Sequence, residues 1–335
     1  MPAQLNDSLR LLARITPGRL INLVRLFFSY YLSRYSGKIR HWGYPFTISI
    51  EPTTSCNLRC PECPSGLRQF TRDTGQISPE MYHHVIDQLY PDLFYLILYF
   101  QGEPYLHPLF FQMVEYARKK RIYTATSTNA QFLTGQFAKK TVESGLDRII
   151  ISLDGLDQET YEKYRVGGSF EKVIEGVRNL VKWKKELRSA TPFIILQFIV
   201  FRTNEHQVPA MRKLAKELGV DKLELKSAQV NNYEEGNPLI PVTESLSRYR
   251  MKDDGHYVIN NPLYNHCLRM WRGCVITWDG LVVPCCFDKD ADHRLGDLKK
   301  QSFMEIWQGG AYDNFRKKIF SARSEIDICR NCTER

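Results

Sequence analysis

Three cysteines at a C-x3-C-x2-C spacing, Cys56, Cys60 and Cys63, constrain the fold more than any other feature of the sequence. They follow directly after an alternating, strand-like run at residues 46–50, so one short loop at the end of a strand can turn three thiolates inward. Such a loop can hold a metal ion or an iron-sulfur cluster. Because it supplies three thiolates rather than four, a cubane cluster would keep one iron without a protein ligand. A small molecule can coordinate that open iron.

In spacing and position this loop resembles the cysteine loop of the radical S-adenosylmethionine (radical SAM) superfamily. The resemblance implies that Cys56, Cys60 and Cys63 hold a [4Fe-4S] cluster whose open iron binds the amino and carboxylate groups of S-adenosylmethionine (SAM). Reductive cleavage of SAM would release methionine and a 5′-deoxyadenosyl radical, which abstracts a substrate hydrogen. Glu62 departs from the family pattern, in which an aromatic residue often stands beside the adenine. A structural zinc site is the alternative, but zinc normally takes four ligands.

Strand-like and helix-like segments alternate from about residue 46 to residue 227, the pattern of βα units on a parallel sheet. Six strands with five intervening helical segments are expected, the strands at residues 46–50, 95–100, 122–127, 148–153, 193–201 and 222–226. This order resembles the partial (β/α)6 barrel of the same superfamily. The predicted fold class is therefore α/β: a partial (β/α)6 TIM-like barrel as radical SAM core, a small C-terminal cysteine-rich domain and an N-terminal basic amphipathic helix. The predicted domains are residues 1–45, 46–230 and 231–335.

A turn after the second predicted strand carries a candidate SAM-binding motif, because parallel barrels place their active sites at the carboxyl ends of the strands. Gly102 and Glu103 lie in Gln101-Gly-Glu-Pro, which resembles the superfamily's Gly-Gly-Glu-Pro motif that binds the SAM amino group. Gln101 replaces the first glycine. By itself such a sequence is usually only a turn. Asn129 follows the third strand, where the superfamily commonly has Thr-Asn-Gly.

The fourth and fifth predicted strands carry the remaining SAM candidates. Ser152 and Asp154 are two residues apart, so both point to the same side of a strand. With Arg165 they resemble the superfamily set in which a serine and an arginine hold the SAM carboxylate, a group that matches the planar guanidinium. Gln197 and Asn204 lie near the expected adenine or ribose site. Helix-capping, surface or strand-end roles are the alternatives for these residues.

A second group of cysteines follows residue 266: Cys267, Cys274, Cys285, Cys286, Cys329 and Cys332. Cys267 and Cys285 frame two short apolar runs joined by an Asp-Gly turn, which is typical of a β-hairpin. The pattern resembles the cluster-binding extension called SPASM, and more closely its shortened form, called Twitch. The resemblance implies one auxiliary [4Fe-4S] cluster on Cys267, Cys285, Cys329 and Cys332.

The auxiliary site leaves alternatives open. Four thiolates would close the cluster, which favours electron relay over substrate coordination. A zinc knuckle on the same four cysteines is the rival interpretation. Cys286 can replace Cys285 as a ligand, whereas Cys274 is interpreted as a small buried residue.

The first 45 residues are strongly basic, with seven Arg and Lys residues against one acidic residue. Apolar residues cover a wide face of an expected helix at residues 9–35, and Asn22, Arg25 and Ser29 form a narrow polar stripe. The apolar run is too short to span a bilayer and is interrupted by Arg25. Packing of the apolar face onto the body of the protein is favoured. Peripheral contact with an anionic membrane surface is the alternative.

Composition sets the remaining limits. A chain of 335 residues can bury a large core, and nine cysteines without a secretory leader indicate thiolate ligands in a reducing, cytoplasmic compartment, with membrane association as an option. The net charge of +9 lies mostly in the first segment, so no nucleic-acid partner is expected. The predicted function is that of a radical SAM enzyme acting on a small-molecule or peptide substrate, with an electron donor such as flavodoxin or ferredoxin. An iron-sulfur electron carrier or redox sensor is the alternative, and no general base can be assigned.

Overall fold

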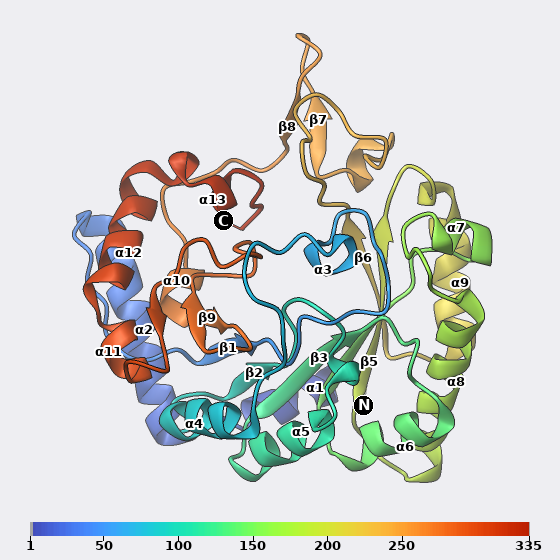
Figure 1. The fold of residues 1–335 in the computed structure, drawn as a ribbon, viewed down its shortest axis with the longest axis horizontal. Coiled ribbons are helices and arrows are strands. Elements are labelled where there is room, and N and C mark those ends of the chain that lie inside the picture. The colour runs from blue at the N-terminus through green and yellow to red at the C-terminus, as the bar shows by residue number, and fades with distance from the viewer. Residues whose placement is uncertain (1–2, 335) are drawn as a thin grey trace. The chain divides into compact units, whose positions relative to one another are not determined.

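The structure is a computed structural model and describes residues 3–334. The chain forms two compact units, each assembled from distant parts of the sequence. The first unit combines the residues up to Asp7 with Cys56–Gln69 and Ala125–Asn261. The second combines Ser8–Ser55, Phe70–Thr124 and the residues from Pro262 onward. Figure 1 labels most of the helices and strands.

The sheet of the first unit consists of parallel strands in the order β3-β4-β5-β6. These are β3 (Tyr123–Thr128), which enters this unit at Ala125, β4 (Arg148–Ser152), β5 (Phe193–Val200) and β6 (Lys222–Ser227). The helices are α3 (Pro64–Leu67), α6 (Gly135–Glu143), α7 (Gln158–Glu162), α8 (Phe170–Glu186) and α9 (Val208–Leu218). Figure 1 shows α6, α8 and α9 along one side of the strands. A separate antiparallel pair joins β7 (Tyr249–Met251) to β8 (Tyr257–Ile259).

Helix α8 shows how the sequence specifies these elements. Its N-cap Ser169 accepts a hydrogen bond from the Lys172 amide at 3.3 Å, which satisfies one of the unpaired donors of the first turn. Val173, Val177 and Leu180 recur at helical spacing and are fully buried against the sheet side. The helical period of these apolar residues therefore predicted both the helix and the face it buries.

The second unit contains the first strands of the barrel together with the C-terminal hairpin. Its strand order is β11-β10-β9-β1-β2, in which β1 (Thr47–Ile50) pairs in parallel with both β2 (Tyr95–Ile97) and β9 (Gly273–Ile276). β10 (Leu281–Val283) and β11 (Gly296–Asp297) continue the sheet in antiparallel fashion. The helices are α2 (Pro17–Ser36), α4 (Pro79–Leu89), α5 (Phe110–Lys119), α10 (Arg269–Arg272), α11 (Phe303–Trp307), α12 (Gly310–Ala322) and α13 (Asp327–Arg330).

The six strands predicted between residues 46 and 227 are β1 to β6, and the predicted C-terminal hairpin is β9-β10. The hairpin turns at Gly280, whose φ of +89° lies in the left-handed region that glycine tolerates best. The Gly280 amide donates to the Thr277 carbonyl at 3.0 Å and closes the turn. The Asp-Gly signal thus predicted the turn correctly.

The N-terminal segment differs from its prediction in two ways. It forms two helices, α1 (Ala3–Leu12) and α2, instead of one, because Thr16 caps α2 and Pro17 occupies its first turn. The prediction that the apolar face packs inward is also wrong. Asn22 and Ser29, expected on an outer polar stripe, are buried, while large apolar side chains of α2 are exposed.

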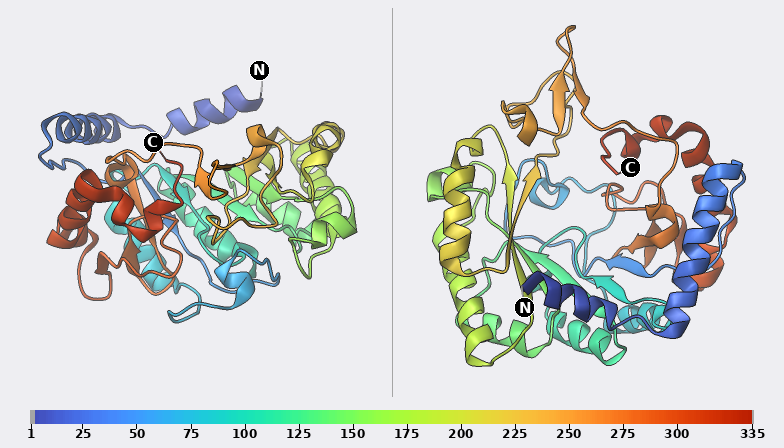
Figure 2. Two further views of the ribbon diagram at one scale, coloured as in Figure 1. Left: turned by 90° about the horizontal axis from the view of Figure 1, so that it is seen from above. Right: turned by 180° about the vertical axis from the view of Figure 1, so that it is seen from behind.

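The inner contacts of α2 are with the C-terminal part of the same unit. Figure 2 shows α2, in blue, running beside the C-terminal helices. The contact includes Tyr30, whose ring lies 5.3 Å from that of Trp271 on α10. Within residues 3–334, no helix combines the length and apolar character that crossing a bilayer requires.

Candidate active site

The predicted cluster loop precedes α3, and Cys63 occupies the N-cap position of that helix. The Cys63 amide donates to the Cys60 carbonyl at 3.3 Å, and the Leu58 amide lies 3.5 Å from the Cys56 sulfur. Gly66 lets α3 fold back onto this loop, because a Cβ there would lie 2.5 Å from the Cys60 backbone nitrogen. The three predicted ligands therefore share one tightly packed turn.

Two side chains, one directly after β3 and one after α7, direct hydrogen-bond donors at the sulfurs of this loop. Asn129, directly after β3, places Nδ2 3.9 Å from the Cys56 sulfur and 2.8 Å from Asn57 Oδ1. Arg165 places a terminal nitrogen 3.9 Å from the Cys60 sulfur. Burial raises the pKa of the Cys60 thiol, and the positive charge of Arg165 partly offsets that effect. Such donors stabilise thiolates, the form that binds iron.

Asp154 fixes the position of Arg165. Its buried carboxylate accepts a hydrogen bond from Arg165 Nε at 2.6 Å and another from the Ile199 amide at 2.7 Å. Burial raises the pKa of Asp154, and the charge of Arg165 opposes that shift. The Nε contact leaves the far edge of the guanidinium turned toward Cys60. Asp154 thus orients the arginine that was predicted to hold the SAM carboxylate.

Ser152 and Gln197 are direct neighbours in the sheet. They are register partners on β4 and β5, and both side chains are buried. Asn204 donates to the backbone carbonyls of Asp154 at 3.0 Å and Ile199 at 2.9 Å. It therefore caps the ends of β4 and β5, which agrees with the strand-end role given above as the alternative. In the first unit, then, Ser152 and Gln197 are neighbours on β4 and β5, and Asp154 after β4 binds Arg165 after α7. Their role in SAM binding stays a prediction.

Gly102 and Glu103 lie against the backbone that leads into the cysteine loop. Gly102 has a φ of +74°, and a Cβ there would lie 2.2 Å from the Thr53 carbonyl oxygen. The Glu103 amide donates to the Ser55 carbonyl at 2.8 Å. The buried Glu103 carboxylate accepts from the Tyr105 amide at 3.2 Å. Only glycine fits this close approach, which explains the residue type at position 102.

Glu62 has a role that sequence reasoning did not find. Its carboxylate accepts hydrogen bonds from the Asn231 amide at 2.7 Å and from Asn237 Nδ2 at 3.1 Å. It therefore ties the cluster loop to the polar segment that follows β6. The departure of this position from the aromatic residue of the family was the only signal available in the sequence.

The four predicted auxiliary ligands all belong to the second unit. Cys267 interacts electrostatically with Cys285, Cys329 and Cys332, and burial is the main cause that raises the pKa of each of these three thiols. Helix α13 positions Cys329, and the Cys332 amide donates to its carbonyl at 3.0 Å. By contrast, Cys274 is buried in β9 beside Tyr312, in agreement with its interpretation as a small buried residue.

Two arginines accompany these cysteines. Arg323 is buried, with one terminal nitrogen 3.5 Å from the Cys332 sulfur and the other 2.7 Å from the His266 carbonyl oxygen. Arg269 lies 3.3 Å from the sulfur of the exposed Cys286 and 2.5 Å from Glu334. The positive charges of these two arginines would compensate the negative charge of the neighbouring cysteines in their thiolate form.

A buried ion pair links the first strand to the C-terminal hairpin. Both terminal nitrogens of Arg72 bind the Glu51 carboxylate, at 2.8 and 2.6 Å, and the Trp278 amide donates to the same carboxylate at 3.2 Å. Burial raises the pKa of Glu51, and Arg72 opposes the shift. Because Glu51 ends β1 and Trp278 lies in the β9-β10 turn, the pair fixes the hairpin against the strand that precedes the cluster loop.

A cavity of about 290 Å³ in the second unit reaches three of the C-terminal cysteines, Cys274, Cys285 and Cys286. It is lined by residues of β1, β2 and β9, by the aromatic side chains of Tyr95 and Tyr99, and by Arg269, Arg272, Cys285 and Cys286. Its volume is near the lower end of the range for small-molecule sites, and its mixture of aromatic walls and a few charged groups is typical of them.

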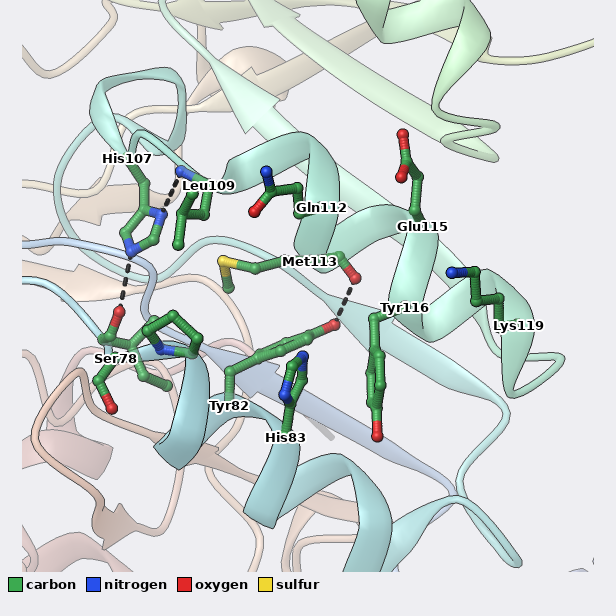
Figure 3. A pocket seen from close by; sticks show the side chains of 12 residues that line it. Ser78, Tyr82, His83, His107, Leu109, Gln112, Met113, Glu115, Tyr116 and Lys119 are labelled. Carbon is green, nitrogen blue, oxygen red and sulfur yellow. Dashed lines mark hydrogen bonds between the residues drawn. The ribbon is translucent and has the colours of Figure 1, made fainter.

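Another cavity of about 290 Å³ lies between α4 and α5 (Figure 3). Tyr82 donates to the Met113 carbonyl at 2.7 Å, and His107 Nδ1 accepts from the Leu109 amide at 3.2 Å. Figure 3 shows His83 facing Tyr116, and their rings are stacked 4.1 Å apart. None of the predicted cluster or SAM residues lines this cavity.

Within residues 3–334, no three His, Cys, Asp or Glu side chains stand in a ready-made metal geometry. The chemistry of the two cysteine groups nevertheless fits iron-sulfur clusters. Each group consists of thiols with guanidinium or amide donors beside the sulfurs. The assignment of individual ligands stays a prediction.

Comparison with known proteins gives two family matches. A family model of the Radical SAM superfamily matches residues 50–215, and a model of an iron-sulfur cluster-binding domain, SPASM, matches residues 267–333. The chain is 28% identical to the tungsten-containing aldehyde ferredoxin oxidoreductase cofactor-modifying protein of Pyrococcus furiosus, over 86% of this chain and 87% of the relative. It is also 28% identical to the AdoMet-dependent heme synthase of Methanosarcina barkeri, over 82% of this chain and 84% of the relative.

Solved structures agree at the level of the fold. SuiB of Streptococcus suis bound to S-adenosylmethionine superposes with a TM-score of 0.63 at 13% identity, covering 88% of this chain and 73% of SuiB. Native anSMEcpe with bound AdoMet superposes with a TM-score of 0.62 at 19% identity, covering 86% of this chain and 88% of the anSMEcpe chain. The predicted α/β fold class, with a cluster-binding domain at the C-terminus, is confirmed.

Proposed function

Because the chain belongs to the radical SAM superfamily and carries a C-terminal SPASM domain, we propose that it abstracts a hydrogen atom from a peptide or a small, sugar-like alcohol. Its cofactors are a [4Fe-4S] cluster, SAM and auxiliary iron-sulfur. Bound there, SAM and the cluster would supply a 5′-deoxyadenosyl radical as the group that takes the hydrogen atom. The observation that carries the proposal is the cysteine loop with the donors of Asn129 and Arg165 directed at its sulfurs.

Different residues of the chain would bind the cluster and SAM. Cys56, Cys60 and Cys63 would hold the cluster. The Asp154–Arg165 ion pair would present the guanidinium to the SAM carboxylate, because Nε is occupied by Asp154 while a terminal nitrogen faces the loop. Gly102 and Glu103 would bind the amino group of SAM. Ser152 and Gln197, on β4 and β5, would make the remaining contacts.

The cavity beside Cys285 supports the proposed substrate class. A volume of about 290 Å³ suits one amino-acid side chain or one sugar-sized ring, and the nearby Arg269 and Arg272 favour a substrate with a carboxylate or another anionic group. Two structural neighbours support both options, since one was solved with the precursor peptide SuiA and another with AdoMet and 2-DOIA.

The C-terminal cysteines would handle the second electron. Loss of one hydrogen atom leaves a substrate radical, and loss of one further electron and a proton completes a two-electron oxidation. An auxiliary cluster on Cys267, Cys285, Cys329 and Cys332 would accept that electron. An external donor such as flavodoxin or ferredoxin would supply the electron that cleaves SAM.

The test is 5′-deoxyadenosine formation by anaerobically reconstituted protein given dithionite and SAM. Wild type is expected to release 5′-deoxyadenosine and methionine in equal amounts, and Cys56→Ala is expected to release neither. His84→Ala, which alters an exposed side chain on α4 outside the predicted cluster and SAM residues, serves as the control and should retain the reaction.

An electron carrier or redox sensor would give a different pattern. Such a protein would bind iron and undergo reversible reduction, but it would leave SAM intact under the same conditions. A reconstituted wild type with full iron content and no 5′-deoxyadenosine would therefore overturn the proposal in favour of that alternative.

A further inference from the structure

Helix α2 presents its polar side to the protein and its apolar side to solvent. The buried residues are Arg19, Asn22, Leu26, Ser29, Tyr30 and Ser33. The outer face, as we define it, consists of Leu20, Ile21, Val24, Phe28, Tyr31 and Tyr35 on α2, together with Trp42 after the helix. These side chains are between 41% exposed, for Trp42, and 82% exposed, for Tyr35. Trp42 stacks on Phe28 at 5.8 Å, which makes the outer face continuous.

Specific hydrogen bonds hold α2 in this orientation. Arg19 donates to the carbonyls of Arg14 at 2.7 Å, Arg121 at 2.9 Å and Tyr90 at 2.7 Å. Asn22 exchanges two hydrogen bonds with the backbone of Tyr44, at 2.9 and 2.8 Å. Rotating the helix to bury its apolar side would leave these backbone groups and a guanidinium without partners, which is costly. The exposed apolar side is therefore a built feature of the fold.

Basic residues border the outer face on both sides. At 100° per residue, Arg25 and Arg34 lie on opposite edges of the apolar stripe, and both are exposed. Lys38 and Arg40 follow the helix and are also exposed. No acidic residue occurs between Ser8 and Ile50. Long basic side chains can bury their stems against apolar surface while their charges reach a polar layer.

This pattern favours an anionic lipid surface over a second copy of the chain. In a symmetric dimer through the outer face, the arginines of the two copies would be brought together, and like charges at an interface repel. A bilayer containing anionic lipid instead offers an apolar layer for the stripe and negative headgroups for its borders. Large exposed apolar patches with polar rims mark interaction sites.

We propose that the outer face of α2 binds the headgroup region of an anionic membrane, with the helix axis parallel to the surface. The protein would then act as a peripheral membrane enzyme. This surface is independent of the cysteine loop, so membrane binding and SAM cleavage can fail separately.

The experiment is co-sedimentation of full-length, reconstituted protein with vesicles. One set contains phosphatidylglycerol and phosphatidylcholine, the other phosphatidylcholine alone. We expect binding to the anionic vesicles, at least tenfold weaker binding to the neutral ones, and weakening by salt. Val24→Glu combined with Phe28→Glu is expected to reduce binding to anionic vesicles at least tenfold. Met251→Glu, the same type of change at an exposed residue of β7, should bind like wild type.

Each variant is also assayed for thermal unfolding and for 5′-deoxyadenosine formation without vesicles, and the double variant is expected to match wild type in both. Three outcomes would overturn the proposal. Wild type can fail to bind anionic vesicles. The double variant can bind them like wild type. In the third outcome, wild type does not bind vesicles but forms a dimer, and the double variant is a monomer. The outer face would then be an interface between two copies of the chain.

Discussion

A single buried carboxylate, Asp154, organises the best-defined part of the candidate site. Its two oxygens are used separately, one by Arg165 Nε at 2.6 Å and one by the Ile199 amide at 2.7 Å. Burial works against its charge, so the ion pair persists only because both partners are present. Sequence reasoning grouped Asp154 with the SAM-binding residues. The geometry adds that Asp154 positions Arg165, and its part in SAM binding stays a prediction.

Asp154→Asn tests this role. Removing one partner of a buried pair leaves the other charge uncompensated, so the free energy of unfolding should fall by about 3 kcal/mol. The affinity for SAM should fall at least about tenfold, because the guanidinium loses its orientation. Urea denaturation and equilibrium binding of SAM to reconstituted protein measure the two effects. Glu159→Gln, which breaks the exposed pair with Lys163, should change neither; unchanged SAM affinity in Asp154→Asn would contradict the role.

His41 is a second residue whose surroundings have a measurable consequence. Its ring lies 5.1 Å from that of Trp307 and 5.9 Å from that of Trp271, with Arg316 nearby. Burial, and then the charge of Arg316, lower the pKa of His41 to about 2. Because this pKa is lower in the folded than in the unfolded state, the stabilisation is complete above the unfolded value of 6.5 and is lost as the pH falls below it.

The free energy of unfolding should therefore drop by about 1.4 kcal/mol between about pH 7.5 and pH 5.5 on account of His41. His41→Phe is expected to remove that part of the pH dependence. Urea denaturation at several pH values gives the slopes. His84→Phe, which alters an exposed histidine on α4, should keep the wild-type slope; equal slopes in wild type and His41→Phe would show that the ring is accessible to protons.

At the scale of elements, the turn that follows β2 depends on a glycine. Gly102 combines a φ of +74° with a Cβ position only 2.2 Å from the Thr53 carbonyl oxygen. Gly135, the first residue of α6, has open space around its Cβ position. The two glycines therefore form a matched pair. At position 102 the neighbours and the backbone conformation leave no room for a side chain, whereas position 135 can accept one.

Gly102→Ala is expected to lower the free energy of unfolding by about 2 kcal/mol and to weaken SAM binding, because the turn must move away from Thr53. Gly135→Ala should leave stability unchanged or raise it by up to about 1 kcal/mol. Denaturant midpoints compare the variants directly. Equal midpoints for both would mean that the backbone at position 102 adapts easily.

The elements also show which parts of the fold can be predicted from sequence. Strands β1 to β6 and helix α8 followed from apolar periodicity and capping residues, which are local signals. The orientation of α2 did not, because its polar residues bind backbone groups of distant segments, such as Tyr90 and Arg121. Hydrophobicity alone assigned the wrong face to the protein interior. Likewise, nothing in the sequence near Glu51 indicates its partner Arg72.

At the scale of the whole molecule, the chain contains two groups of cysteines with separate predicted tasks. Spacing alone indicated the first group, because Cys56, Cys60 and Cys63 share a loop and are close in sequence. The association of Cys267 with Cys329 and Cys332 required the long-range resemblance, since residues that far apart in sequence carry no local signal of proximity.

The two groups should be separable by metal analysis. Wild type reconstituted without oxygen should bind about eight irons per chain, and Cys329→Ser should bind about four while still cleaving SAM. Cys274→Ser, which alters a buried cysteine outside the predicted ligand set, is the matched control and should keep about eight. About four irons together with one zinc in wild type would identify the C-terminal site as a zinc knuckle.

The parallel pairing of β1 with β9 has a consequence for how the protein is made. Until Gly273–Ile276 leave the ribosome, β1 has a neighbour on one edge only, and its other edge exposes unpaired amide and carbonyl groups. The free edge of β1 can therefore pair only after β9 has been synthesised. A chain shortened before residue 262 would keep the edge open permanently, so we expect it to aggregate during expression instead of yielding a working core.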